Sequence, residues 1–423
     1  MKKTFLKSIG ILCAAAAVCA ALLFGRAAIA SADTQAASVV AESSGTASTV
    51  AAGTGVYSYD EMFSERDLKQ TADLSDAVTY TVTDGQQIRI TEAGVYVLTG
   101  TASEVTVYVE AEKDDKVQIV LDGLNVTNSN FPVIYAKTAD KEFVTVSGDS
   151  TLAVTGSFVS DGDTNTDGVI FSKCDLVLNG TASLTVNSSR NGIVCKDDLK
   201  ITGGTYTVSA ASKAIQANDS IRIADGTFHL TAGTDGLHAE NSDDDSLGYI
   251  YIAGGTFTVQ AGDDGIHAVS VVEIDGGTIT VKASEGIEGT YIQINGGTLN
   301  IQASDDGVNA AGKSSAYSVK VEINGGDITV VMGAGDTDGI DSNGDIIVNG
   351  GTISVTGNST FDYDGSAQLN GGTIYVNGQQ VSTIPNQMMG GRGGMNMGGW
   401  GSGNSGSSGW GNMGGMGGRG GRW

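Results

Sequence analysis

Proline and cysteine are both scarce in this chain, and each scarcity excludes a class of structure. Two prolines among 423 residues suit strands that hydrogen-bond on both sides, because proline lacks the backbone donor that such strands need. Four cysteines are too few for a disulfide scaffold. Cys13 and Cys19 lie in a predicted leader, which leaves Cys174 and Cys195 about one repeat apart. The sequence is compatible with either a disulfide or two buried free thiols here.

Positive charge is also in short supply. The chain has 23 Lys and Arg residues against 48 Asp and Glu residues, so its formal net charge is −25. Nucleic acid and anionic membrane surfaces are therefore poor partners, and cations are good ones.

Long apolar runs are absent after the first 32 residues. Lys2, Lys3 and Lys7 precede an apolar stretch that ends in small residues, which is typical of a cleaved secretory signal peptide over residues 1–32. The stretch is too short for a retained membrane span. Loss of the leader's four positive charges, which include Arg26, would change the net charge to −29. We expect a secreted or cell-surface extracellular protein without stable membrane insertion.

Low-complexity segments frame a repetitive centre. Residues 33–56 are rich in Ala, Ser and Thr, which predicts a linker, and residues 386–423 are rich in Gly, Met and Trp, which predicts a disordered tail. Between them, over residues 57–385, phrases such as "YIAGGTFTV" and "EIDGGTITV" recur with their second glycines 20 to 29 residues apart. These glycines are Gly204, Gly226, Gly255, Gly277, Gly297, Gly326, Gly351 and Gly372. A short fixed period predicts a stack of similar units.

The repeated unit consists of strands. Ile250 and Ile252 alternate with tyrosines, and after a glycine corner Phe257 and Val259 alternate with threonines. A period of two with β-branched residues predicts strands. We therefore predict an all-β, parallel β-solenoid of about three strands per coil, with coils about 4.8 Å apart.

An acid stands directly before a glycine in successive repeats. These acids are Asp235, Asp264, Glu285, Asp306 and Asp338, with Asp364 as a less regular sixth. Stacked coils would bring the first five into one line, which we call the acid column. Two carboxylates about 4.8 Å apart repel by about 1 kcal/mol in water and about 3.5 kcal/mol at an effective dielectric of 20. Because Lys and Arg are scarce in these coils, we expect bound Ca²⁺ to neutralise the column through hard oxygen ligands.

Further acids extend this prediction. Asp263 and Asp305 double the charge at two coils, and a second polar column lies three residues after each acid. The second column reads His238, His267, Glu288, Asn309 and Asp341. The predicted calcium ligands are the five acids of the column together with Asp263, Asp305, Glu288 and Asp341. An isolated Asp-Gly pair is an ordinary turn signal, which is the alternative interpretation.

Two other clusters qualify as metal candidates. Asp161, Asp163 and Asp167 alternate in "DGDTNTDG" as acids do in calcium loops, although the spacing is not that of an EF-hand. A solvated loop is the alternative. His238 and His267 are less favoured as a transition-metal pair, because stacked outward histidines need no metal.

Long segments of the chain carry a family resemblance. "TDGLHAENSDDDSLGYIYIAGGTFTVQAGDDGIHA" and "TDGIDSNGDIIVNGGTISV" resemble the clostridial-type carbohydrate-binding β-helix proteins, and the likeness covers roughly residues 57–385. It implies a right-handed parallel β-helix similar to pectate lyases, bound calcium, an extracellular location and binding of plant-type polysaccharides, including acidic ones. Lys213 departs from the pattern, because it stands where a coil should carry the acid.

The leading hypothesis is a secreted, non-catalytic, calcium-dependent polysaccharide-binding protein for pectate or cellulose. Calcium would bridge protein carboxylates to sugar carboxylates. Tyr249, Tyr251 and Tyr291 alternate with inward isoleucines, so we expect them to face outward and stack on sugars, unless they are plain surface tyrosines. His238 and His267 are also predicted to contact the carbohydrate.

Three alternatives remain open. A pectate lyase would need a calcium ion and a base, for which Lys213 and Lys282 are the candidates, although both also suit charge compensation. A surface adhesin is a structural alternative. The outward threonine pairs, such as Thr256 and Thr258, would suit an ice-binding face, but His229 interrupts their column.

Overall fold

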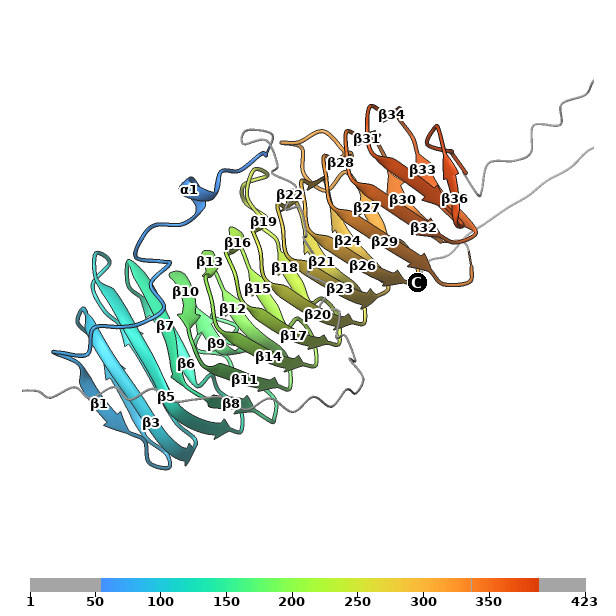
Figure 1. Ribbon diagram of the computed structural model, residues 1–423. Helices are drawn as coiled ribbons and strands as arrows, with labels where there is room; N and C mark the ends of the chain where they lie inside the picture. Colours follow the sequence, from blue (N-terminus) through green and yellow to red (C-terminus); the bar gives the residue numbers. More distant parts are fainter. Residues whose placement is uncertain (1–54, 336, 388–423) are drawn as a thin grey trace, which may run out of the picture. The chain divides into compact units, whose positions relative to one another are not determined.

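Alternating apolar and polar residues form short strands that stack coil upon coil. The computed structural model describes residues 55–335 and 337–387. From β6 (Ile134–Thr138) to β32 (Thr352–Thr356), each strand pairs in parallel with the third strand further along the chain, for example β9 (Gly168–Ser172) with β12 (Asn191–Cys195). The predicted all-β fold with stacked parallel strands is confirmed (Figure 1). Its right-handed winding stays a prediction.

The strand pairings form three ladders, which we call faces; the first is a 12-stranded sheet, and the other two join through β5 (Lys116–Asn128) in a 24-stranded sheet. The first face, called here the acid face, contains β2 (Gln87–Ile90), β4 (Thr106–Glu110), β6 (Ile134–Thr138), β9, β12, β15 (Ile215–Ala217), β18 (Leu237–Ala239), β21 (Asp264–Ala268), β24 (Glu285–Gly289), β27 (Val308–Ala310), β30 (Asp338–Ser342) and β33 (Ser359–Tyr363).

The second face, called here the strap face, contains β1 (Val78–Thr81), β3 (Gly94–Ser103), β5 (Lys116–Asn128), β7 (Lys141–Gly148), β10 (Asp175–Gly180), β13 (Asp198–Ile201), β16 (Ser220–Ile223), β19 (Tyr249–Ile252), β22 (Val271–Ile274), β25 (Tyr291–Ile294), β28 (Lys320–Ile323), β31 (Asp345–Val348) and β34 (Ala367–Leu369).

The third face contains β8 (Ser150–Val154), β11 (Ser183–Ser188), β14 (Thr205–Ala210), β17 (Thr227–Ala232), β20 (Thr256–Ala261), β23 (Thr278–Ala283), β26 (Thr298–Ala303), β29 (Asp327–Met332), β32 (Thr352–Thr356) and β35 (Thr373–Val376). β36 (Gln379–Val381) turns back and pairs antiparallel with β35.

Like residues stack on like residues through the coils. Inside, Tyr206, Phe228 and Phe257 form a stack with ring centroids 5.5 and 4.5 Å apart. At one corner, the amide groups of Asn295, Asn324, Asn349 and Asn370 form a ladder whose Nδ2 to Oδ1 hydrogen bonds are all 2.8 Å long. Parallel in-register stacking satisfies these side chains one coil at a time.

Residues 55–70 cross the strap face as an irregular segment that contains α1 (Tyr59–Met62), and we call them the N-terminal strap (Figure 1). Gln70 accepts a 2.9 Å hydrogen bond from the Gly180 N–H. Asp67 pairs with Lys200 Nζ at 2.9 Å. The strap therefore ties together coils that are far from it in the sequence.

The structure also bears on the cysteines, on membrane-spanning helices and on the predicted terminal segments. Cys174 and Cys195 are both buried free thiols. No helix among the described residues is long and apolar enough to cross a membrane. The predicted signal peptide 1–32, almost all of the linker 33–56 and nearly all of the tail 386–423 lie outside the described residues.

Candidate functional site

Strand register brings the predicted acids together on the acid face. Asp264 lies opposite Glu285, and the residues two positions after each acid stack in one column of buried apolar side chains, from Leu237 through Ile266 to Ile340. The alignment predicted from the sequence is therefore confirmed for Asp235, Asp264, Glu285, Asp306 and Asp338.

The ends of the column differ from the expectation in one respect. Lys213 occupies the equivalent place one coil before Asp235, as predicted. One coil after Asp338 the register gives Ser359, so the assignment of Asp364 to the column is wrong. The apolar Phe361 aligns with Ile340, and this would have been a better guide in the sequence than the Asp-Gly pair.

Basic side chains neutralise the first half of the column. Lys213 Nζ lies 2.6 Å from Asp235, and His238 Nδ1 lies 2.9 Å from the same carboxylate. Burial opposes ionisation of Asp235, but these two partners outweigh it and hold its pKa well below the usual range. The expectation that basic neighbours cannot pair the column is wrong for this half.

The next two coils contain a compact group of Asp264, His267 and Glu288. His267 Nδ1 lies 2.6 Å from Asp264 and 2.7 Å from Glu288, and Lys313 Nζ lies 2.8 Å from Glu288. Burial alone would lower the pKa of His267, but hydrogen bonds to both carboxylates raise it to about 9. Lys313 belongs to an insertion, and no repeat pattern in the sequence placed it on the column.

The group of Asp264, His267 and Glu288 resembles a metal site only in the distances between its ligand atoms. Among the described residues, it is the one set of three or more His, Cys, Asp or Glu side chains whose ligand atoms all lie within 4.8 Å of one another. Its two carboxylates already face a protonated imidazole and a lysine. A cation would have to displace both, so we do not assign a metal here. His238 and His267 stack on each other with ring centroids 4.6 Å apart.

The second half of the column lacks such partners. Burial and neighbouring carboxylates raise the pKa of Glu285 to about 7, that of Asp306 to about 6 and that of Asp341 to about 7. Asn309 donates to Glu285 at 3.0 Å, and the Asp338 N–H donates to Asp306 at 3.1 Å. The Ser342 N–H also donates to Asp341.

Buried oxygen atoms in this half have no hydrogen-bond partner among the described residues. They are Asn309 Oδ1, Thr337 Oγ1, Asp338 Oδ1 and Asp362 Oδ1. Asp362 stacks directly after Asp341 and was not predicted from the sequence. Carboxylate and amide oxygens are the ligands that Ca²⁺ prefers, so the residues present fit a calcium ion.

The two doubled acids lie beside the column. The side chains of Asp263 and Asp305 are exposed, one residue before Asp264 and Asp306. Water therefore screens their charges more than those of the column.

The acids of the 161–167 segment are held separately. Asp161 pairs with Lys137 at 2.8 Å, and Asp167 pairs with Arg190 Nε at 3.2 Å. Asp163 is exposed. Two of the three predicted ligands thus already have a cationic partner.

The predicted sugar-stacking tyrosines are not accessible. Tyr249, Tyr251 and Tyr291 retain only 6%, 0% and 8% exposure. They pack in a separate apolar cluster outside the main core, where the strap covers them and the ring of Tyr57 stacks on Tyr249 at 4.4 Å. The expectation of exposed tyrosines is wrong because a distant segment buries them. The aromatic-rich stretch directly after the linker was the available signal.

The two candidate lysine bases are in different places. Lys213 is ion-paired on the acid face. Lys282 is exposed on β23, on the third face. They therefore do not act on a common point of the acid column.

Comparison with known proteins identifies the family of this chain. A family model described as "Carbohydrate-binding domain-containing protein" matches residues 84–337 and 288–382. The chain belongs to this family. A family relative, the carbohydrate-binding domain-containing protein of Acetivibrio thermocellus (strain ATCC 27405), is 34% identical over 127 residues. That match covers 29% of this chain and 44% of the relative.

A solved structure is also similar. The polysaccharide lyase-like protein from C. thermocellum, as a gadolinium derivative, aligns with a TM-score of 0.48 and 30% identity. The alignment covers 53% of this chain and 96% of that protein.

Proposed function

We propose that this protein is a secreted, calcium-dependent, non-catalytic polysaccharide-binding protein, with pectate-like acidic or other plant-type polysaccharides as ligands. Membership in a family named for carbohydrate binding supports the general class. The observation that carries the calcium dependence is the uneven neutralisation of the acid column. Its first half has cationic partners, whereas its second half has crowded carboxylates and unpaired buried oxygens.

The calcium ligands that we propose come from this second half. They are Glu285, Asp306, Asn309, Asp338, Asp341 and Asp362. When bound, the ion supplies a divalent positive charge that attracts sugar carboxylates as well as protein ones. Because these residues lie on four successive coils, neighbouring subsets of them, rather than all six together, would hold calcium. The column would remain able to accept an anionic chain along the coil direction. The regular spacing of the coils suits a repetitive ligand.

The same geometry favours binding over lyase chemistry. β-Elimination requires a base that can accept a proton next to the cation. Lys213 is held by Asp235 at 2.6 Å, at the end of the column opposite to the proposed ion, and Lys282 is on another face. Formation of unsaturated, ultraviolet-absorbing products from polygalacturonate with calcium would instead establish the lyase.

Co-sedimentation with insoluble polygalacturonate and with cellulose tests the proposal. We expect retention with calcium and release by EGTA, together with bound calcium in a metal analysis. Asp341→Asn should weaken retention, whereas Asp305→Asn should not, because Asp305 is exposed beside the column. No retention on any polysaccharide would remove the proposal, and retention that EGTA leaves unchanged would remove its calcium dependence.

A further inference from the structure

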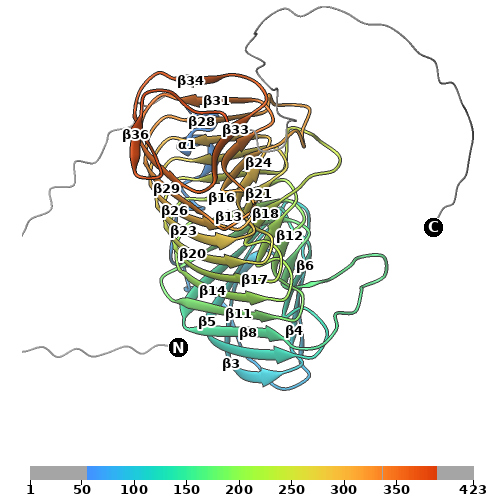
Figure 2. The ribbon, with the colours of Figure 1, turned by 90° about the vertical axis from the view of Figure 1, so that its right-hand side faces the viewer.

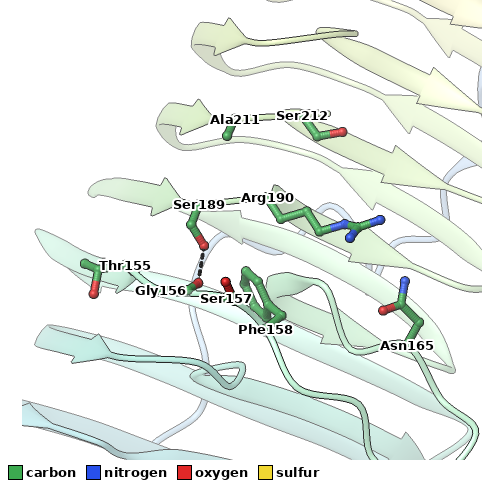
Figure 3. A pocket seen from close by; sticks show the side chains of 9 residues that line it. All are labelled: Thr155, Gly156, Ser157, Phe158, Asn165, Ser189, Arg190, Ala211 and Ser212. Atoms are coloured by element: carbon green, nitrogen blue, oxygen red, sulfur yellow. Dashed lines mark hydrogen bonds between the residues drawn. The ribbon is translucent and has the colours of Figure 1, made fainter.

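A polar cleft lies at the head of the acid column, away from the proposed calcium ligands. The loop 155–167 between β8 and β9 projects beyond the stack of coils (Figure 2). Together with the turns at 189–190 and 211–212 it encloses a cavity of about 510 Å³. Phe158, Asn165, Ser189, Arg190 and Ser212 are among the side chains that line it (Figure 3).

Hydrogen bonds place this cleft in line with the column. The Ser212 N–H donates to Arg190 O at 2.9 Å, and the Thr234 N–H donates to Ser212 O at 3.2 Å. Arg190, Ser212 and Thr234 thus lie on successive coils, and Thr234 directly precedes Asp235. Asp306 is about 24 Å from the coil of Arg190, at about 4.8 Å for each of the coils between them.

The guanidinium of Arg190 is oriented by the protein and remains open to a ligand. Buried Asp167 holds Nε at 3.2 Å and itself accepts a 2.8 Å hydrogen bond from Asn165. The Arg190 side chain is 57% exposed, and Nε makes its one ion pair among the described residues. The two terminal nitrogens are therefore available as a planar fork, which matches a carboxylate in geometry and charge.

The other walls suit a sugar ring. Phe158 is half-buried, packs against the core and presents an apolar surface within the cleft (Figure 3). Ser189 donates to Gly156 O at 2.5 Å, which fixes the loop against the next coil. A flat apolar side chain with hydroxyl and amide groups around it is typical of sites that hold a polar ligand in one orientation.

We propose that this cleft binds one uronic acid residue of an acidic oligosaccharide without calcium, through a sugar carboxylate on Arg190 and a sugar ring on Phe158. The proposal rests on the proposed function, because it adds a calcium-independent subsite to the same polysaccharide-binding face. A long chain reaches both the cleft and the calcium ligands. A short one reaches a single subsite.

Calorimetric titration of the mature protein with trigalacturonate in EGTA is the direct test. We expect measurable binding by the unmodified protein, and about ten- to hundredfold weaker binding by Arg190→Gln, from the loss of a charge-assisted carboxylate pair. Phe158→Ala should also weaken it. Arg89→Gln is the matched control, because Arg89 is a comparably exposed arginine that pairs with Glu110 in a distant coil.

Three further outcomes separate this proposal from the one on which it rests. If trigalacturonate does not bind in EGTA while calcium-dependent retention on polygalacturonate persists, the cleft proposal is overturned and the proposed function stands. If Arg190→Gln and Arg89→Gln lose affinity equally, the cleft is not the site. Equal binding of neutral cellotriose would overturn the role of the carboxylate. The amount of calcium bound per molecule should be the same in Arg190→Gln as in the unmodified protein.

Discussion

At the scale of single residues, the glycine after each acid is needed for contact between coils rather than for a turn. Asp264, Glu285 and Asp338 begin strands, so the ordinary turn interpretation of Asp-Gly does not apply to them. A Cβ on Gly286 would lie 2.3 Å from Gly307 O and 2.4 Å from Ile301 Cγ2. Backbone of the next coil occupies the place of a side chain.

Replacement of one such glycine should therefore destabilise the stack. We expect Gly286→Ala to lower the free energy of unfolding by about 1–3 kcal/mol, the usual cost of overpacking. Gly312→Ala is the control, because its Cβ would make only an ordinary 3.5 Å contact with Val319. Urea unfolding of both variants in calcium measures the difference, and similar losses would contradict this explanation.

Glu142 is a second residue with a specific consequence, because it is a carboxyl group in the apolar interior. It lies opposite Val117 and Leu176 and is fully buried, and the Ser172 side chain only partly offsets the effect of that burial on its carboxyl group. Burial raises its pKa to about 8. The folded protein thus keeps a proton that the unfolded chain loses near pH 4.3, so stability falls as pH rises from about 4.3 to about 8.

Glu142→Gln removes this titration without changing the shape. As pH rises through that window, the unfolding free energy of the variant should increase relative to that of the unmodified protein by up to about 1.4 kcal/mol for each pH unit. Urea unfolding at about pH 5 and about pH 8 compares the two proteins under identical calcium. Glu112→Gln, on the surface, should show no such trend. A constant difference between Glu142→Gln and the unmodified protein at both pH values would show that Glu142 does not titrate there.

At the scale of elements, the strap depends on one buried ion pair. Asp67 is 1% exposed, lies 2.9 Å from Lys200 Nζ and 3.7 Å from Lys141 Nζ. Burial opposes its ionisation, but the Ser64 N–H and Lys200 outweigh this and keep its pKa below the usual range. Removing one member of such a pair leaves a buried charge uncompensated.

We expect Asp67→Ala to lower the free energy of unfolding by about 3–5 kcal/mol and to loosen the strap. Limited trypsin digestion reports on this directly, since Arg66 and Lys69 lie within the strap. Faster cleavage there should accompany the lost stability. Asp60→Ala changes an exposed acid of the same segment and should leave both readouts unchanged. Equal cleavage of the two variants would mean that another contact holds the strap.

The parts of this fold that depend on the repeat alone could be predicted from the sequence. The acid column follows from the apolar residue two positions after each acid, which stacks on its equivalents from Leu237 to Ile340. Contacts that depend on a segment outside the repeat could not be predicted. Tyr57 reaches Tyr249 from nearly two hundred residues away, and Lys313 reaches Glu288 from an insertion. Periodicity contains no information about such contacts.

At the scale of the whole molecule, charge is distributed unevenly along the coils. Lys213, His267 and Lys313 supply cations to the first part of the column, so this part should be stable without metal. Glu285, Asp306 and Asp341 have raised pKa values and no cationic partner among the described residues. Their raised pKa values mean that the calcium-free protein loses stability as pH rises from about 4.3 to about 7.

Calcium should reverse that loss, and by more at higher pH. At about pH 7.5 the carboxylates are ionised in the calcium-free protein, so calcium binds without displacing protons, whereas at about pH 5 it competes with them. We expect calcium at about a hundred times its Kd to stabilise the protein by about 2.7 kcal/mol at the higher pH and by clearly less at the lower. Thermal melting in calcium and in EGTA at both pH values measures this difference. Asp341→Asn should shrink the calcium-induced rise in Tm, and Asp305→Asn should retain it. A calcium-free protein that melts no earlier than the calcium-loaded one at either pH would show that the column needs no ion.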